Sequence, residues 1–177
     1  MNPFKYSAIE IAIIISEMEL GCREENRLIE EIWFGEKRYL EKKYRNNKKK
    51  FILDVYYWMH YVYEKYSIDD EFLKIQNELK KNNRTVDEND YVNDYSQLEL
   101  FFKKSRIHIL YGQGPDYVRI KLRTLLSTYG YKRRSYQIVE HIKFCILVYR
   151  FNVTLRDREE CDIETCNLDK MLTFRVF

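Results

Sequence analysis

Apolar residues recur every three or four positions along the first half of the chain, which is the spacing of helices with one buried face. Ser7 and Glu10 have the spacing of a capping box, directly before an apolar segment that stops at Gly21. Three more segments with helical spacing follow. We therefore predict a helical region over residues 1–86, with helices beginning near residues 7, 23, 51 and 67.

The pattern changes in the segment 87–116. Residues 82–95 are polar and acidic, and Gly112-Gln113-Gly114-Pro115 is a strong breaker of regular structure. Between them, apolar and polar residues alternate over 97–111, with a possible turn at 103–106. We predict an acidic loop, a β-hairpin and a linker for 87–116, with a helix as the alternative to the hairpin.

The last third of the chain, 117–177, combines the helical spacing of three to four residues with the alternation typical of strands. A leucine-rich segment stops at Gly130, and Ser135 is placed to cap a longer helix whose buried face runs from Ile138 to Leu147. Short alternating segments precede and follow these helices. The expected elements are a strand at 118–120, helices at 122–130 and 135–147, and strands at 151–156 and 171–176.

A short helix, a tight turn, a longer helix and a β-hairpin follow one another in a winged helix-turn-helix. The predicted fold class is therefore α+β, mainly α. We expect an N-terminal helical region and, over 117–177, a winged-helix-like module with a small antiparallel sheet.

The string LRTLLSTYGYKRRSYQIVEHIKFCILVYRFNVTL, within this module, resembles a winged-helix-like module of bacterial conflict and restriction-type proteins. The resemblance covers the last third of the chain only. It implies an accessory or sensing subunit of an antiphage system, or a phage protein aimed at one. The matching positions are Leu125, Leu126, Gly130, Arg133, Arg134, Val139, Ile142 and Leu147.

Composition fits a globular protein, with 45% hydrophobic and 33% charged residues. The chain has 16 Tyr but only 5 Gly and 2 Pro, which favours helices over turns. Many of the tyrosines fall in the helix predicted over 51–66. Three interpretations of this helix stay open: packing in the core, a surface for a protein partner, or stacking of nucleic-acid bases.

Four cysteines, Cys22, Cys145, Cys161 and Cys166, lack the spacing of a zinc site, and no secretory signal precedes them. We expect reduced thiols in a cytoplasmic protein with no metal and no cofactor. The best apolar run, 8–15, contains Glu10 and is far shorter than the roughly 20 apolar residues that cross a bilayer. No membrane is therefore expected as a partner.

The net charge of +3 is small, but its distribution is uneven. The segment 37–50 carries eight Lys or Arg and one acid, and 103–143 carries ten Lys or Arg and two acids. Between them, 87–99 carries five acids and no base. Basic blocks of this kind bind nucleic acid through its phosphates, or are solvated helix faces.

The second helix of a helix-turn-helix enters the major groove of DNA with its N-terminal residues first. Arg reads guanine there, Gln reads adenine, and Lys contacts phosphates. Arg133 and Arg134 belong to the pattern that identifies the module, so the alternative is that they serve the fold or a protein contact. The predicted nucleic-acid-binding residues are Lys132, Arg133, Arg134, Tyr136, Gln137, Lys143, Lys48, Lys49 and Lys50.

Catalytic motifs are weak in this sequence, which holds three histidines. Arg134 and His141 have the spacing found in the catalytic motif of the all-helical HEPN ribonucleases, where the His acts as acid or base. We expect a non-enzymatic accessory subunit of a prokaryotic or phage conflict assembly that binds DNA, or else RNA. A larger complex or a homo-oligomer is expected. A protein-only adaptor is the second hypothesis, and a HEPN-like ribonuclease the third.

Overall fold

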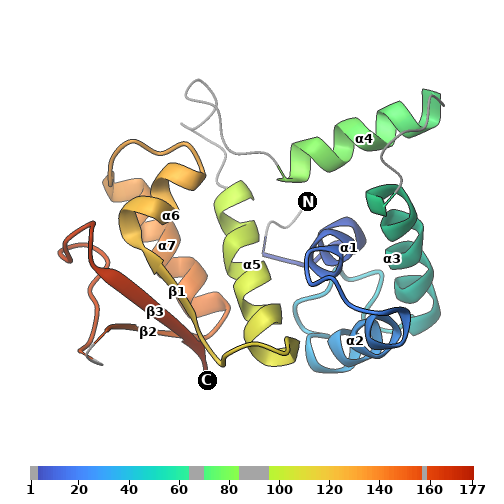
Figure 1. The fold of residues 1–177 in the computed structure, drawn as a ribbon, viewed down its shortest axis with the longest axis horizontal. Coiled ribbons are helices and arrows are strands. Elements are labelled where there is room, and N and C mark those ends of the chain that lie inside the picture. Colours follow the sequence, from blue (N-terminus) through green and yellow to red (C-terminus); the bar gives the residue numbers. More distant parts are fainter. Residues whose placement is uncertain (1–3, 64–69, 84–95, 157–158) are drawn as a thin grey trace. The chain divides into compact units, whose positions relative to one another are not determined.

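A computed structural model of the protein describes residues 4–63, 70–83, 96–156 and 159–177 (Figure 1). The chain divides into two compact units, Met1–Asn83 and Arg84–Phe177. The described residues form seven helices and one three-stranded antiparallel sheet, which confirms the predicted α+β, mainly α class. None of the described helices is long and apolar enough to span a bilayer.

The first unit is helical throughout its named elements. The predicted capping box is present, since the Ser7 hydroxyl accepts from the Glu10 amide and the Ser7 amide donates to Glu10 Oε2 over 2.9 Å. Gly21 does not end this helix but serves as the N-cap of the next one. The elements are α1 (Ala8–Ser16), α2 (Cys22–Gly35), α3 (Lys48–Tyr63) and α4 (Asp70–Asn83).

Helix α1 lies in the core of the first unit, as its apolar run predicts. Ile9 and Ile13 pack against Ile75 and Leu79 of α4, and half-buried side chains of α3 cover this cluster. Seven of the nine residues of α1 are buried. The run at 8–15 is therefore apolar because the helix is enclosed on nearly every side.

The tyrosine-rich helix α3 divides its aromatic residues between core and surface. Val55 and Met59 are buried, and Trp58 and Tyr61 pack against the α1–α4 cluster. The helix begins three residues earlier than predicted, so the run Lys48–Lys50 forms its first turn and is neither the end of α2 nor a loop. Its exposed aromatic residues are Tyr57 and Tyr63.

The second unit contains the sheet. Strand order is β1-β3-β2, with both pairings antiparallel, so the last strand lies in the centre. The strands, the two helices between β1 and β2 and the Ser135 cap agree with the predicted elements. The elements are α5 (Ser96–Tyr111), β1 (Val118–Lys121), α6 (Leu122–Thr128), α7 (Tyr136–Val148), β2 (Phe151–Leu155) and β3 (Met171–Val176).

The predicted hairpin over 97–111 is wrong, because this segment is the helix α5. The apparent alternation arises because the helix is buried on more than one side. Leu98 and Leu100 are both buried, and so are Lys103, Ser105 and Ile107. Such burial produces strand-like spacing in a segment that contains no Gly or Pro to form a turn.

Helix α5 packs against the sheet through a cluster of phenylalanine rings. The Phe102 centroid lies 5.9 Å from that of Phe151 on β2 and 6.0 Å from that of Phe174 on β3. Phe101 also contacts Phe174, with centroids 5.7 Å apart. The segment 112–115, expected to link two domains, therefore joins α5 to β1 within one compact unit.

Candidate nucleic-acid interface

The turn between α6 and α7 is built by two local features. Gly130 has a φ of 81°, a left-handed conformation that glycine adopts without strain, and it lets the chain leave α6 sharply. The Ser135 hydroxyl then accepts from the Ile138 amide and begins α7. Residues 132–134 lie between these points, and Tyr136 and Gln137 form the first turn of α7.

Four of the predicted contact residues are exposed at this point. Lys132, Arg133 and Gln137 are exposed, and the Tyr136 side chain is 72% exposed. Two cations, one ring and one amide thus gather around the N-terminal end of α7. This is the end that a helix-turn-helix presents to DNA.

Arg134 lies in the same turn but is turned away from solvent. Its Nη1 atom donates to the carbonyl oxygen of Cys166 over 2.6 Å and to that of Ile163 over 3.1 Å. These bonds attach the turn to the loop that precedes β3. Arg134 therefore acts as a structural tie, in line with the alternative that the pattern's arginines serve the fold.

Lys143, in the middle of α7, has its charge offset by two carboxylates. Its Nζ atom lies 2.8 Å from Glu164 and 3.4 Å from Glu140. The hydrogen bond to Glu164 is the main reason that its pKa is raised. Lys143 is thus a weaker candidate for a phosphate contact than its charge alone suggests.

The outer face of α7 also carries two apolar residues, one of which the pattern placed in the core. Leu147 was expected on the buried face, yet its side chain is 73% exposed. Phe144 is 46% exposed on the same helix. The sequence could not separate these positions from core positions, because α7 is apolar on more than one face.

The second predicted cluster, Lys48–Lys50, is largely offset by acids of the first unit. Lys48 Nζ lies 3.2 Å from Glu30, and Lys50 Nζ lies 3.1 Å from Asp54. Lys49 is exposed. The structure therefore does not gather these three ammonium groups into one cationic site.

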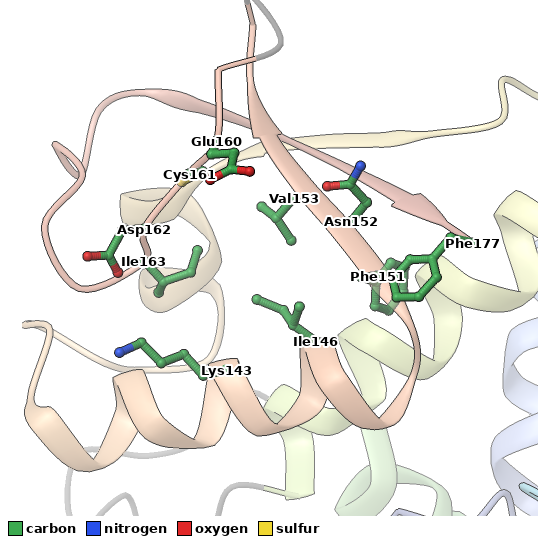
Figure 2. Close-up of a pocket in the computed structure, with 10 residues that line it drawn as sticks. All are labelled: Lys143, Ile146, Phe151, Asn152, Val153, Glu160, Cys161, Asp162, Ile163 and Phe177. Atoms are coloured by element: carbon green, nitrogen blue, oxygen red, sulfur yellow. The ribbon is translucent and has the colours of Figure 1, made fainter.

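A groove of about 520 Å³ lies between α7, β2 and the loop at 160–163 (Figure 2). Its wall is apolar at Ile146, Val153 and Ile163. The charged groups of Lys143, on α7, and of Asp162, on the loop that Arg134 holds through Ile163, stand at its edge. The groove has a shape and lining suited to an apolar side chain of a partner.

His141 has its polar contacts with buried groups of the second unit. Its Nε2 atom lies 3.3 Å from Glu99 Oε1 and 3.6 Å from Cys145 Sγ. The carboxylate favours a charged ring, but burial disfavours it. Burial prevails and lowers the pKa of His141 to about 4.

The spacing of Arg134 and His141 therefore does not bring two catalytic groups to one substrate position. Arg134 is bonded to the 163–166 loop, whereas His141 contacts α5. Strands also follow these residues, unlike in an all-helical nuclease. Within the described ranges, no group of three or more His, Cys, Asp or Glu side chains is placed to hold a metal ion.

Comparisons with known proteins found no relative of this chain. No family model, no curated protein and no solved structure matches the chain.

Proposed function

We propose that the protein is a non-enzymatic nucleic-acid-binding subunit, and that the N-terminal end of α7 contacts DNA. The observation that carries the proposal is the exposure of Lys132, Arg133, Tyr136 and Gln137 at the start of the second helix of a helix-turn-helix. Arg134 supports the site from behind, because its bonds to the 163–166 loop hold the turn in place.

The four exposed residues divide by chemistry. Lys132 suits a phosphate, whereas Arg133 suits either a phosphate or the guanine edge. Gln137, on the first turn of α7, can pair with adenine. The exposed ring of Tyr136 can stack on an unpaired base. Single-stranded RNA is therefore the alternative ligand.

The test compares two charge-matched double variants of the full chain. Lys132→Gln with Arg133→Gln removes the two exposed cations of the turn, and Lys74→Gln with Lys80→Gln removes two exposed cations of α4. Fluorescence anisotropy with duplex DNA, duplex RNA and single strands measures affinity from about 50 to 200 mM salt.

We expect the turn variant to lose at least about tenfold in affinity and to lower the salt slope by about two, since each phosphate contact adds about one to it. The α4 variant should lose much less. Equal losses in both variants, or no binding by the unaltered protein at low salt, would refute the proposal.

A protein-only adaptor is the second candidate, and the exposed side chains of Phe144 and Leu147 favour it. Apolar residues on an exposed helix face are typical of surfaces that bind a protein, including a second copy of the same chain. Sedimentation of Leu147→Glu and of Arg133→Gln separates the candidates. Self-association that is lost only in Leu147→Glu supports the adaptor, and a chain that stays monomeric at high concentration removes the homo-oligomer.

The proposed setting is a prokaryotic or phage conflict assembly. It rests on the resemblance carried by the residues between Leu125 and Leu147. The genes next to the one for this protein test it. A nuclease or ATPase gene beside it would support an accessory subunit, and unrelated metabolic neighbours would count against this setting.

A further inference from the structure

In the first unit, the segment before α1 lies beside the loop between α2 and α3. Tyr6 and Leu40 form a parallel bridge. The Tyr6 amide donates to the Tyr39 carbonyl oxygen over 2.7 Å, and the Glu41 amide donates to the Tyr6 carbonyl oxygen over 3.2 Å. These bonds hold Lys5 next to a loop rich in Lys and Arg.

Three cationic side chains converge there. Lys5 Nζ donates to the Arg38 carbonyl oxygen over 2.6 Å, and Arg45 Nε donates to the Leu40 carbonyl oxygen over 3.1 Å. Lys5 Nζ and Arg38 Cζ lie 5.9 Å and 4.4 Å from the centroid of one ring, that of Tyr39. The Arg38 guanidinium also contacts the Tyr39 hydroxyl.

The electrostatics agree with this geometry. Burial lowers the pKa of Lys5, and the charges of Arg45 and Arg38 lower it further. Within this loop, the Glu41 Oε2 atom lies 3.0 Å from Lys43 Nζ. The like charges of Lys5, Arg38 and Arg45 repel one another, and an anion between them would relieve that repulsion.

We propose that Lys5, Arg38 and Arg45 form a binding site for a phosphate group. Two guanidinium groups and one ammonium supply charge and directed donors that match phosphate oxygens. The site is separate from Lys48–Lys50, where Glu30 and Asp54 offset two of the charges. It belongs to the first unit and does not rest on the function proposed for α7.

The phosphate has two possible sources, the backbone of a nucleic acid or a small free phosphate compound. Inorganic pyrophosphate and a single-stranded oligothymidine are the probes, used with the full chain at low salt. Calorimetry measures the first and fluorescence anisotropy the second.

The test variant is Lys5→Gln with Arg38→Gln, and the control is Lys42→Gln with Lys49→Gln. The control removes the same charge from exposed positions near the same loop. We expect pyrophosphate affinity to fall at least tenfold in the test variant and less than threefold in the control. Lys5→Arg, which keeps the charge, should retain binding.

The two sources give different results. If oligothymidine affinity falls in parallel and pyrophosphate competes with the oligonucleotide, the ligand is a nucleic-acid backbone. If only pyrophosphate binding falls, the ligand is a small phosphate. Equal losses in test and control variants, or no pyrophosphate binding by the unaltered chain, overturn the proposal.

A second measurement covers the case in which the double variant is poorly folded. In the unaltered chain labelled with ¹³C in lysine side chains, pyrophosphate should raise the pKa of Lys5, because an anion favours its charged form. It should leave Lys49 unchanged. A Lys5 resonance that does not respond to pyrophosphate contradicts the site.

Discussion

Arg134 donates from Nη1 to the carbonyl oxygen of Cys166 across 2.6 Å, joining the turn before α7 to the loop before β3. The same atom reaches the Ile163 carbonyl oxygen. Its neighbour Arg133 is exposed. Two adjacent arginines of one motif thus lie in different surroundings, one bonded to the 163–166 loop and one exposed to solvent.

This difference predicts unequal effects of the two arginines on stability. Arg134→Gln should lower the free energy of unfolding by about 1.5–3 kcal/mol, because two carbonyl oxygens in a part-buried site lose a charged donor. Arg133→Gln should change it by less than about 0.5 kcal/mol, as is usual for exposed positions. Urea unfolding followed by circular dichroism measures both. An equal loss of unfolding free energy in the two variants would show that Arg134 does not stabilise the fold through these bonds.

The phenylalanine cluster predicts that α5 is part of the core of the second unit. Phe102→Ala should lower the free energy of unfolding by about 3–5 kcal/mol, because the ring is fully buried among Phe151 and Phe174. Phe144→Ala removes an equal volume from an exposed position and is the control. The same denaturation experiment applies, and a small effect at Phe102 would contradict the packing of α5 on the sheet.

His141 predicts a dependence of stability on pH. Its pKa of about 4 in the folded chain lies below the value of about 6.5 expected when unfolded, so the unfolded chain binds the extra proton between these values. The stabilisation from a neutral ring is complete above about pH 6.5 and is lost as the pH falls towards 4.

The measurement compares the unaltered chain with His141→Gln at several pH values. The contributions of all other titrating groups to the pH dependence are the same in both chains and cancel in the difference. The difference in unfolding free energy should grow by about 1–3 kcal/mol from pH 4 to pH 7. A difference that shrinks over this range would mean that Glu99 controls the ring and holds it charged.

Cys161 and Cys166 predict a thiol pair close enough to form one disulfide. Their side chains are hydrogen-bonded to each other. Burial is the main cause that raises the pKa of Cys161 to about 12, and the contact with Cys166 is the second. Cys161 therefore stays protonated at neutral pH. Diamide should accept two hydrogens from the pair and leave one intramolecular disulfide.

Mass spectrometry of the Cys22→Ser chain before and after diamide measures this. The oxidised chain should lose two hydrogen masses, and the tryptic peptide that contains both Cys161 and Cys166 should carry that loss. In Cys161→Ser, the same treatment should leave no intramolecular bond. Oxidation that links chains without joining these two residues would contradict the pairing.

Local features were predicted well because each depends only on residues a few positions apart in the sequence. The capping box of Ser7 and Glu10, the Ser135 cap and the stop at Gly130 depend on hydrogen bonds or backbone freedom within a few residues. The strands of the second unit followed from alternation in the same way. The acidic residues 87–95, expected to form a loop, lie outside the described residues.

The candidate site was only partly predictable. The sequence placed Lys132, Arg133 and Arg134 together, but it could not tell that a loop about 30 residues further along would bind one of them. Nor could it bring Lys5 beside Arg38 and Arg45, because the pairing of Tyr6 with Leu40 joins distant segments. No local pattern marks such a pairing.

By itself, the sequence determined where most helices begin, where the strands of the second unit lie and which segments carry charge, since these depend on neighbours in the chain. The tertiary structure decided which side of each element is covered. It made α5 a helix buried on several sides, left Leu147 exposed, and turned Arg134 inward. Those outcomes depend on burial and on carbonyl oxygens supplied by distant segments, so periodicity could not reveal them.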